Sequence, residues 1–99
     1  MINPTVGRIV YYWPGGRAHT EDPGRQPLAA TIAHVHNERM INIGYLQIDG
    51  VARDASCVPL VQDGDERPDA AFCEWMPYQK GQAAKTEQLE AKVETQPAG

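Results

Sequence analysis

The fold is decided by the stretch Leu28-Ala-Ala-Thr-Ile-Ala-His-Val-His36, Asn37-Glu-Arg39, Met40-Ile-Asn-Ile-Gly-Tyr-Leu-Gln-Ile48, Asp49-Gly50. β-Branched residues favour a strand in the first run, and large apolar residues recur on one side of the second. Only three polar residues separate the two runs, which predicts a β-hairpin. Asp-Gly is a strong turn dipeptide, so we expect a second tight reversal directly after it.

The flanking sequence continues the same pattern. Residues 6–13 are rich in β-branched and aromatic side chains and end at Pro14-Gly15-Gly16, which predicts a strand closed by a breaker. Residues 14–27 lack an apolar periodicity and predict a long exposed loop. Residues 57–61 form a short apolar run that Pro59 restricts to an edge or an irregular strand. After an acidic loop, residues 70–76 predict a last strand that Pro77 stops.

Strands at intervals of about ten residues with turn signals between them are typical of a small all-β domain. We therefore predict a mainly β fold, an antiparallel barrel or roll of five to six strands, as one domain over residues 1–78. Residues 79–99 are polar and predict a tail that is partly helical and then disordered. Its large apolar residues, Leu89 and Val93, are spaced i,i+4 and form a narrow stripe.

The charge distribution disfavours nucleic acid as a partner. The chain of 99 residues carries a net charge of -4, and its arginines are scattered singly before residue 79. Nucleic-acid affinity needs clustered Lys or Arg. No apolar run is long enough to span a membrane, and the first residues do not resemble a secretory leader, so we expect a cytoplasmic protein without membrane association.

Cysteine and histidine are the residues in this sequence that could form a metal site. Cys57 and Cys73 fit no C-x-x-C pattern and are predicted to be buried, reduced thiols. His34 and His36 alternate on a strand, so both imidazoles project from one face. A metal site would need Cys57, Cys73 or His19 as a further ligand. A solvated histidine pair is the alternative that we prefer, and we expect no metal and no cofactor.

Other motifs are incomplete as catalytic or binding sites. The carboxylates Asp63, Asp65, Glu66 and Asp69 lack the spacing of a calcium loop. Gly15-Gly16-Arg17 lacks the rest of a phosphate-binding loop. Cysteine catalysis by Cys57 or Cys73 with His34 would need an activated thiolate, whereas both cysteines border apolar runs. The sequence therefore predicts a protein that is not an enzyme.

Aromatic residues form the main binding candidate. They lie at the ends of the first and last predicted strands: Tyr11, Tyr12, Trp13, Trp75 and Tyr78. Consecutive aromatic residues on a strand cannot all face inward, and an exposed aromatic strip would dock an extended peptide or stack bases. Core packing is the alternative, because a small domain needs large side chains to close its core.

Three segments resemble a group of small bacteriophage and prophage proteins: Pro4-Thr-Val-Gly-Arg-Ile-Val-Tyr-Tyr12, Ala29-Ala-Thr-Ile32 and Phe72-Cys-Glu-Trp-Met-Pro-Tyr-Gln79. The resemblance implies an SH3-like β-barrel and a location in the bacterial host cytoplasm or in a virion, and it carries no functional residues. The expected function is a non-enzymatic protein-protein interaction module, a minor virion, assembly or host-interaction component. The alternative is a nucleic-acid-binding barrel that stacks bases, and the oligomeric state stays open.

Overall fold

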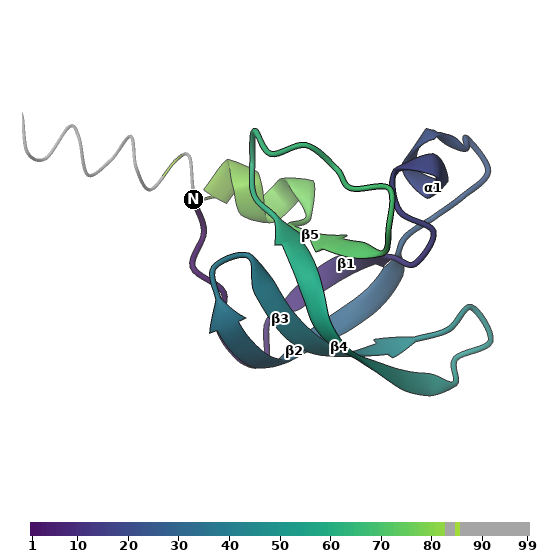
Figure 1. The fold of residues 1–99 in the computed structure, drawn as a ribbon, viewed down its shortest axis with the longest axis horizontal. Coiled ribbons are helices and arrows are strands. Elements are labelled where there is room, and N and C mark those ends of the chain that lie inside the picture. Colours follow the sequence, from purple (N-terminus) through teal and green to yellow (C-terminus); the bar gives the residue numbers. More distant parts are fainter. Residues whose placement is uncertain (83–84, 86–99) are drawn as a thin grey trace, which may run out of the picture.

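The computed structural model describes residues 1–82 and 85, which form a five-stranded barrel (Figure 1). In chain order the elements are β1 (Ile9–Trp13), α1 (Arg17–Glu21), β2 (Leu28–Asn37), β3 (Met40–Leu46), β4 (Ala52–Val61) and β5 (Phe72–Glu74). The predicted fold class, a small mainly β barrel, is confirmed.

The barrel closes because the short strand β5 lies between β1 and β4. Strands β1 to β4 pair antiparallel in chain order, β5 pairs antiparallel with β1, and β5 pairs parallel with β4. Strand directions cannot alternate around a closed ring with an odd number of strands. One parallel pair is therefore unavoidable, and the expected antiparallel arrangement holds for the other four pairs. The loop from Val61 to Phe72 arches over the barrel end to make this parallel return (Figure 1).

The hairpin that the sequence predicts is present. Strands β2 and β3 are joined by a turn at Glu38 and Arg39, and Val35 pairs with Ile41. The second reversal at residues 47–51 is also present, with Gly50 at a φ of 83° and the Val51 N–H donating to Asp49 Oδ1. The last strand is shorter than residues 70–76, because only residues 72–74 pair with neighbours.

Buried residues form two clusters. The main core takes alternate residues of all five strands and the residue after β5: Val10, Tyr12, Ala30, Ile32, Ile41, Ile43, Val58, Leu60, Cys73 and Trp75. Trp13, Val61 and Phe72 project from the opposite face and form a second cluster with Tyr11. The predicted burial of Cys73 is confirmed, and this burial raises the pKa of its thiol to about 12.

Part of the predicted loop at residues 14–27 is helical, which the sequence analysis missed. Helix α1 has five residues and none of them is buried, so its sequence has no apolar periodicity that would predict a helix. It is held from its start, where the Arg17 N–H donates to the Pro68 carbonyl at 2.9 Å and the Arg17 guanidinium pairs with Asp69 at 2.8 Å. Contacts with the 62–71 loop thus position this helix.

Cys57 is exposed, so its predicted burial is wrong. The strand is longer than residues 57–61 and contains a β-bulge, in which Ser56 and Cys57 face the single residue Asn42 between the pairs Ile43–Ala55 and Ile41–Val58. Cys57 takes a φ of 53° there. The extra residue turns Cys57 outward while Val58 points into the core, which also makes this the irregular strand that Pro59 suggested.

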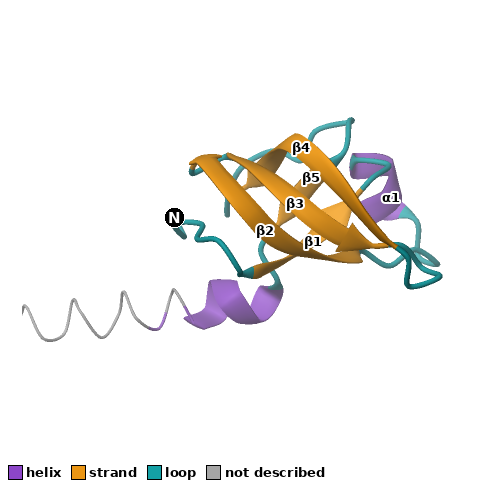
Figure 2. Ribbon diagram, turned by 90° about the horizontal axis from the view of Figure 1, so that it is seen from below, coloured by secondary structure: helices purple, strands orange, loops and turns teal. Residues whose placement is uncertain are grey.

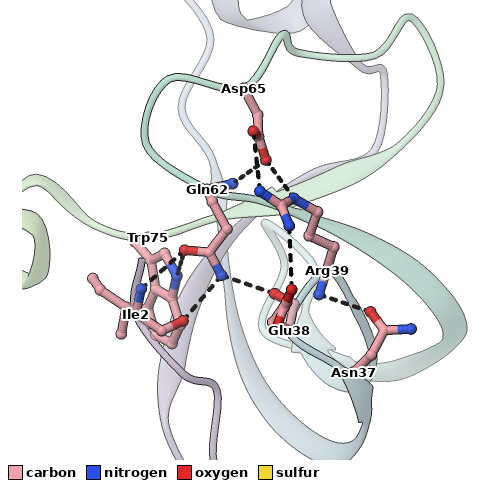
Figure 3. A network of polar contacts seen from close by, with 7 residues as sticks. All are labelled: Ile2, Asn37, Glu38, Arg39, Gln62, Asp65 and Trp75. Atoms are coloured by element: carbon pink, nitrogen blue, oxygen red, sulfur yellow. Dashed lines mark hydrogen bonds and ion pairs between the residues drawn. The ribbon is translucent and has the colours of Figure 1, made fainter.

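A buried glutamine ties four parts of the chain together at one end of the barrel (Figure 3). The Gln62 amide accepts hydrogen bonds from Trp75 Nε1 at 3.1 Å and from the Ile2 N–H at 3.2 Å. It donates to the carbonyls of Ile2 at 3.0 Å and Glu38 at 2.8 Å. Beside it Arg39 hydrogen-bonds Asp65, which lowers the pKa of that carboxyl.

Residues 77–82 are helical and lie on a different side of the barrel from α1 (Figure 2). The Gln79 side chain anchors them by accepting from the Met76 N–H and donating to the Ile9 carbonyl, both at 2.8 Å. The predicted tail is thus described only at its start, and Leu89, Val93 and residues 95–99 lie outside the described residues. Among the residues described, no helix has the length and apolar character needed to cross a bilayer.

We expect Gln62→Ala to lower the free energy of unfolding by about 2 to 4 kcal/mol, because it leaves the buried Trp75 Nε1–H and partly buried backbone groups of Ile2 and Glu38 without this partner. Urea denaturation measures the effect. Asp63→Ala is the matched control: Asp63 is the next residue, is exposed, and should cost no more than about 0.5 kcal/mol. Equal losses in the two variants would contradict this role of Gln62.

Candidate interaction surface

The structure does not gather the five predicted aromatic residues into one exposed strip. Tyr12, Trp13 and Trp75 are buried, Tyr11 is half-buried, and Tyr78 is 73% exposed. For the three buried residues the core-packing alternative is favoured. A binding role stays a prediction for Tyr11, on β1, and for Tyr78, in the helical residues 77–82.

The two buried tryptophans also have their indole N–H groups hydrogen-bonded within the chain. Trp13 Nε1 donates to Glu74 Oε1 at 2.9 Å, and Arg67 pairs with the same carboxylate at 3.1 Å. The Tyr12 and Tyr45 rings pack with their centroids 4.6 Å apart, and burial, the main cause, raises the pKa of Tyr12. Arg8 lies over the Trp75 ring at 5.4 Å. These rings close the core and are not available for stacking on a ligand.

The outward face of the sheet carries an apolar groove instead. Register places Ile9 beside Thr31, Thr31 beside Gly44, and Leu46 beside Ala52, so the groove crosses β1, β2, β3 and β4. Its volume is about 390 Å³, and we call it the outer groove. It is lined by Ile9, Ala29, Ala30, Thr31, Gly44, Tyr45, Leu46, Ala52 and Arg53.

Small side chains make this face hollow. Ala29, Gly44 and Ala52 occupy outward positions where larger residues would fill the space, while Ile9 and Leu46 stand beside them with 42% and 48% of their surface exposed. Contiguous apolar surface of this kind commonly marks an interaction site. Arg53, the charged residue among those that line the groove, pairs with Tyr45 and brings its backbone carbonyl near Gly44, so its side chain projects from the opposite face of the sheet.

A second hollow of about 750 Å³ continues the groove past Ala29 and Leu46. It extends to Pro14, Pro27 and Ile48, and Ile48 is 96% exposed at the turn after β3. Val51, on the other side of the same turn, is also exposed. Three of the seven large apolar residues that are exposed in the described chain, Ile9, Leu46 and Ile48, therefore line these two adjoining hollows.

Another hollow has a different chemistry. It has a volume of about 420 Å³ and is lined mainly by charged side chains of both signs. Two of its cations are engaged within the chain, Arg17 with Asp69 and Arg67 with Glu74, and its acidic residues outnumber its basic ones. The net charge of the lining is therefore negative, which disfavours phosphate and nucleic acid.

His34 and His36 do project from one face, as predicted, with ring centroids 4.7 Å apart. Cys57 lies near His36, whereas Cys73 is in the core. Within residues 1–82 and 85, no group of three or more His, Cys, Asp or Glu side chains is arranged to hold a metal.

Large or reactive side chains do not predict the outer groove. The sequence feature that indicates it is Ala or Gly at strand positions that alternate with core residues, as at Ala29 beside Ala30 and Gly44 beside Ile43. On a solvated strand face such positions usually carry polar residues.

Gly44→Val should fill the groove floor and leave the fold intact. A Cβ at Gly44 meets only the Arg53 carbonyl, at an ordinary 3.9 Å. Because valine suits a strand better than glycine, we expect the free energy of unfolding to be unchanged or raised by up to about 1 kcal/mol. Gly16→Ala is the contrasting variant: at a φ of 70° its Cβ would overlap the Asp69 backbone, so it should be clearly destabilised in the same urea titration. A large loss of stability in Gly44→Val would contradict the open groove.

No family model matches the chain, and no curated protein or solved structure is similar to it. The functional conclusion therefore depends on the groove and on the residues that line it.

Proposed function

We propose that this protein is a non-enzymatic interaction module that binds an apolar segment of a partner protein in the outer groove. The observation that carries the proposal is that the exposed side chains of Ile9 and Leu46 flank a floor of small residues, with Ile48 in the adjoining hollow. Burying about 100 Å² of apolar surface stabilises a complex by roughly 2.5 kcal/mol before the costs of association.

The chemistry of the groove defines the partner further. A floor of Ala29, Gly44 and Ala52 admits one or two large aliphatic or aromatic side chains from the partner. Arg53 pairs with Tyr45 and so projects from the opposite face of the sheet, which leaves the floor of the groove apolar. The proposed ligand is thus a segment with one or two large apolar side chains.

The proposal extends to the setting in which the module works. The resemblance to small phage and prophage proteins favours an SH3-like barrel that engages a phage or host protein during assembly or infection. In this view the module is a minor virion, assembly or host-interaction component that acts by docking.

A library of displayed random peptides tests the proposal directly. We expect selection on the wild-type barrel to enrich peptides with large apolar residues. Leu46→Asp removes apolar contact area and Gly44→Val fills the groove floor, so each should weaken the binding of a selected synthetic peptide by at least about tenfold. Fluorescence anisotropy gives the Kd.

Val6→Asp is the matched control for this binding experiment. It also places a carboxylate on an exposed aliphatic position, 66% exposed, and Val6 does not line the groove. The Kd should stay within about twofold of wild type, as expected for a residue outside the contact surface. Selected peptides that bind Leu46→Asp and wild type equally well would overturn the proposal.

Base stacking on aromatic residues is the second candidate function, and it has less support. Three of the five aromatic candidates are buried, and the chain is acidic overall. We therefore expect no binding of a labelled single-stranded DNA oligonucleotide at low salt. Tight binding that falls steeply with salt and is lost in Tyr11→Ala would favour this function over peptide docking.

A further inference from the structure

One row of residues crosses the outer groove from β1 to β4 and ends on a carboxylate. Register pairs Ile9 with Thr31 and Thr31 with Gly44, and all three line the groove. Gly44 pairs in turn with Asp54, the next residue of the row. Neighbouring strands lie about 4.8 Å apart, so the apolar end of this row and its charged end are roughly 14 Å apart.

The side chain of Asp54 projects to the groove side of the sheet. The following residue, Ala55, pairs with Ile43 and packs against the main core. Successive side chains of a strand point to opposite faces, so Asp54 projects outward, as Gly44 does. By the same alternation Arg53 projects with Ala55, away from the groove. The groove is thus bordered by a negative charge and not by the neighbouring positive one.

This carboxylate has no partner in the part of the chain that the structure describes. Asp54 is exposed, and none of the ion pairs found among residues 1–82 and 85 includes it. Its cross-strand neighbour on β3 is Gly44, which has no side chain to cover it. A cation that enters the groove beside Gly44 therefore meets an unpaired negative charge.

We propose that Asp54 selects partner segments in which a Lys or Arg accompanies the large apolar side chain seated on the groove floor. This inference rests on the function proposed above and adds the charge of the ligand to it. In an extended segment, side chains two residues apart lie on one face and about 7 Å apart. Directly opposed residues of paired strands are about 5 Å apart, so a basic side chain two positions from an apolar one over Gly44 reaches Asp54.

The chemistry of Lys and Arg suits both parts of this site. Their methylene stems pack on apolar surface while the charged group stays in water, so the stem can lie on the small residues of the floor. The net charge of -4 on the whole chain also favours the approach of a basic ligand. Because Asp54 is exposed, the ion pair adds selectivity, and the apolar floor supplies most of the affinity.

Parallel selections from one displayed random-peptide library, on the full chain and on its Asp54→Lys variant, test the charge preference. On wild type we expect peptides that combine large apolar residues with Lys or Arg. On Asp54→Lys we expect the apolar residues to remain and Asp or Glu to replace the basic residues. Circular dichroism confirms that the variant keeps its fold.

A synthetic peptide selected on wild type measures the ion pair itself. Asp54→Asn should raise its Kd about threefold at low salt, and the increase should shrink at high salt. Asp63→Asn is the matched control, because it removes the same charge from an exposed aspartate outside the groove. Its Kd should stay within about 1.5-fold of wild type. Once norleucine replaces the basic residue of the peptide, Asp54→Asn should have no further effect.

The inference and the function on which it rests fail in different ways. Peptides with large apolar residues but no preference for Lys or Arg would overturn the role of Asp54 alone. The same holds for one charge preference on both wild type and Asp54→Lys, and for equal Kd values of Asp54→Asn and wild type. If neither selection enriches large apolar residues, docking in the outer groove is itself wrong, and the role of Asp54 falls with it.

Discussion

The closing of the barrel by β5 is the constraint on which the other features depend. This strand has three residues, all of them buried, and it pairs with β1 on one side and β4 on the other. Glu74 lies with Phe72 on the outward side of β5, and its carboxylate is buried there by hydrogen bonds from Trp13 and Arg67. Closure also brings Trp75, directly after β5, to Gln62, directly after β4, and a buried hydrogen bond joins the two side chains.

Closure also decides which surfaces remain for binding. Because Tyr12, Trp13 and Trp75 are buried, the barrel cannot present the aromatic strip that a stacking function requires. The surface left for binding is the outward face of β1 to β4, where several side chains are small. Gly44 and Ala29 have too little side chain to cover the sheet, and Ile9 and Leu46 cannot bury themselves against so small a floor.

The parts that the sequence predicts well are those determined by local pattern. The hairpin of β2 and β3 and the turn at Asp49 and Gly50 follow from alternation and turn chemistry within a few residues. The parallel pairing of β5, the anchoring of α1 by Pro68 and Asp69, and the exposure of Cys57 depend on contacts between distant segments. Apolar neighbours made Cys57 look buried, and only the extra residue of the bulge opposite Asn42 reverses that expectation.

The outer groove and the bulge of β4 share one face of β3. Gly44 lies in the groove and Asn42 lies opposite the bulge, two residues apart and therefore on the same side of the strand. From Leu46 to Asn42 the strand advances about 13 Å, which an extended segment covers with four residues. A docked segment that follows β3 out of the proposed groove would therefore leave the small residues of its floor and meet polar side chains around Asn42, which sets the length of the apolar part of the proposed ligand.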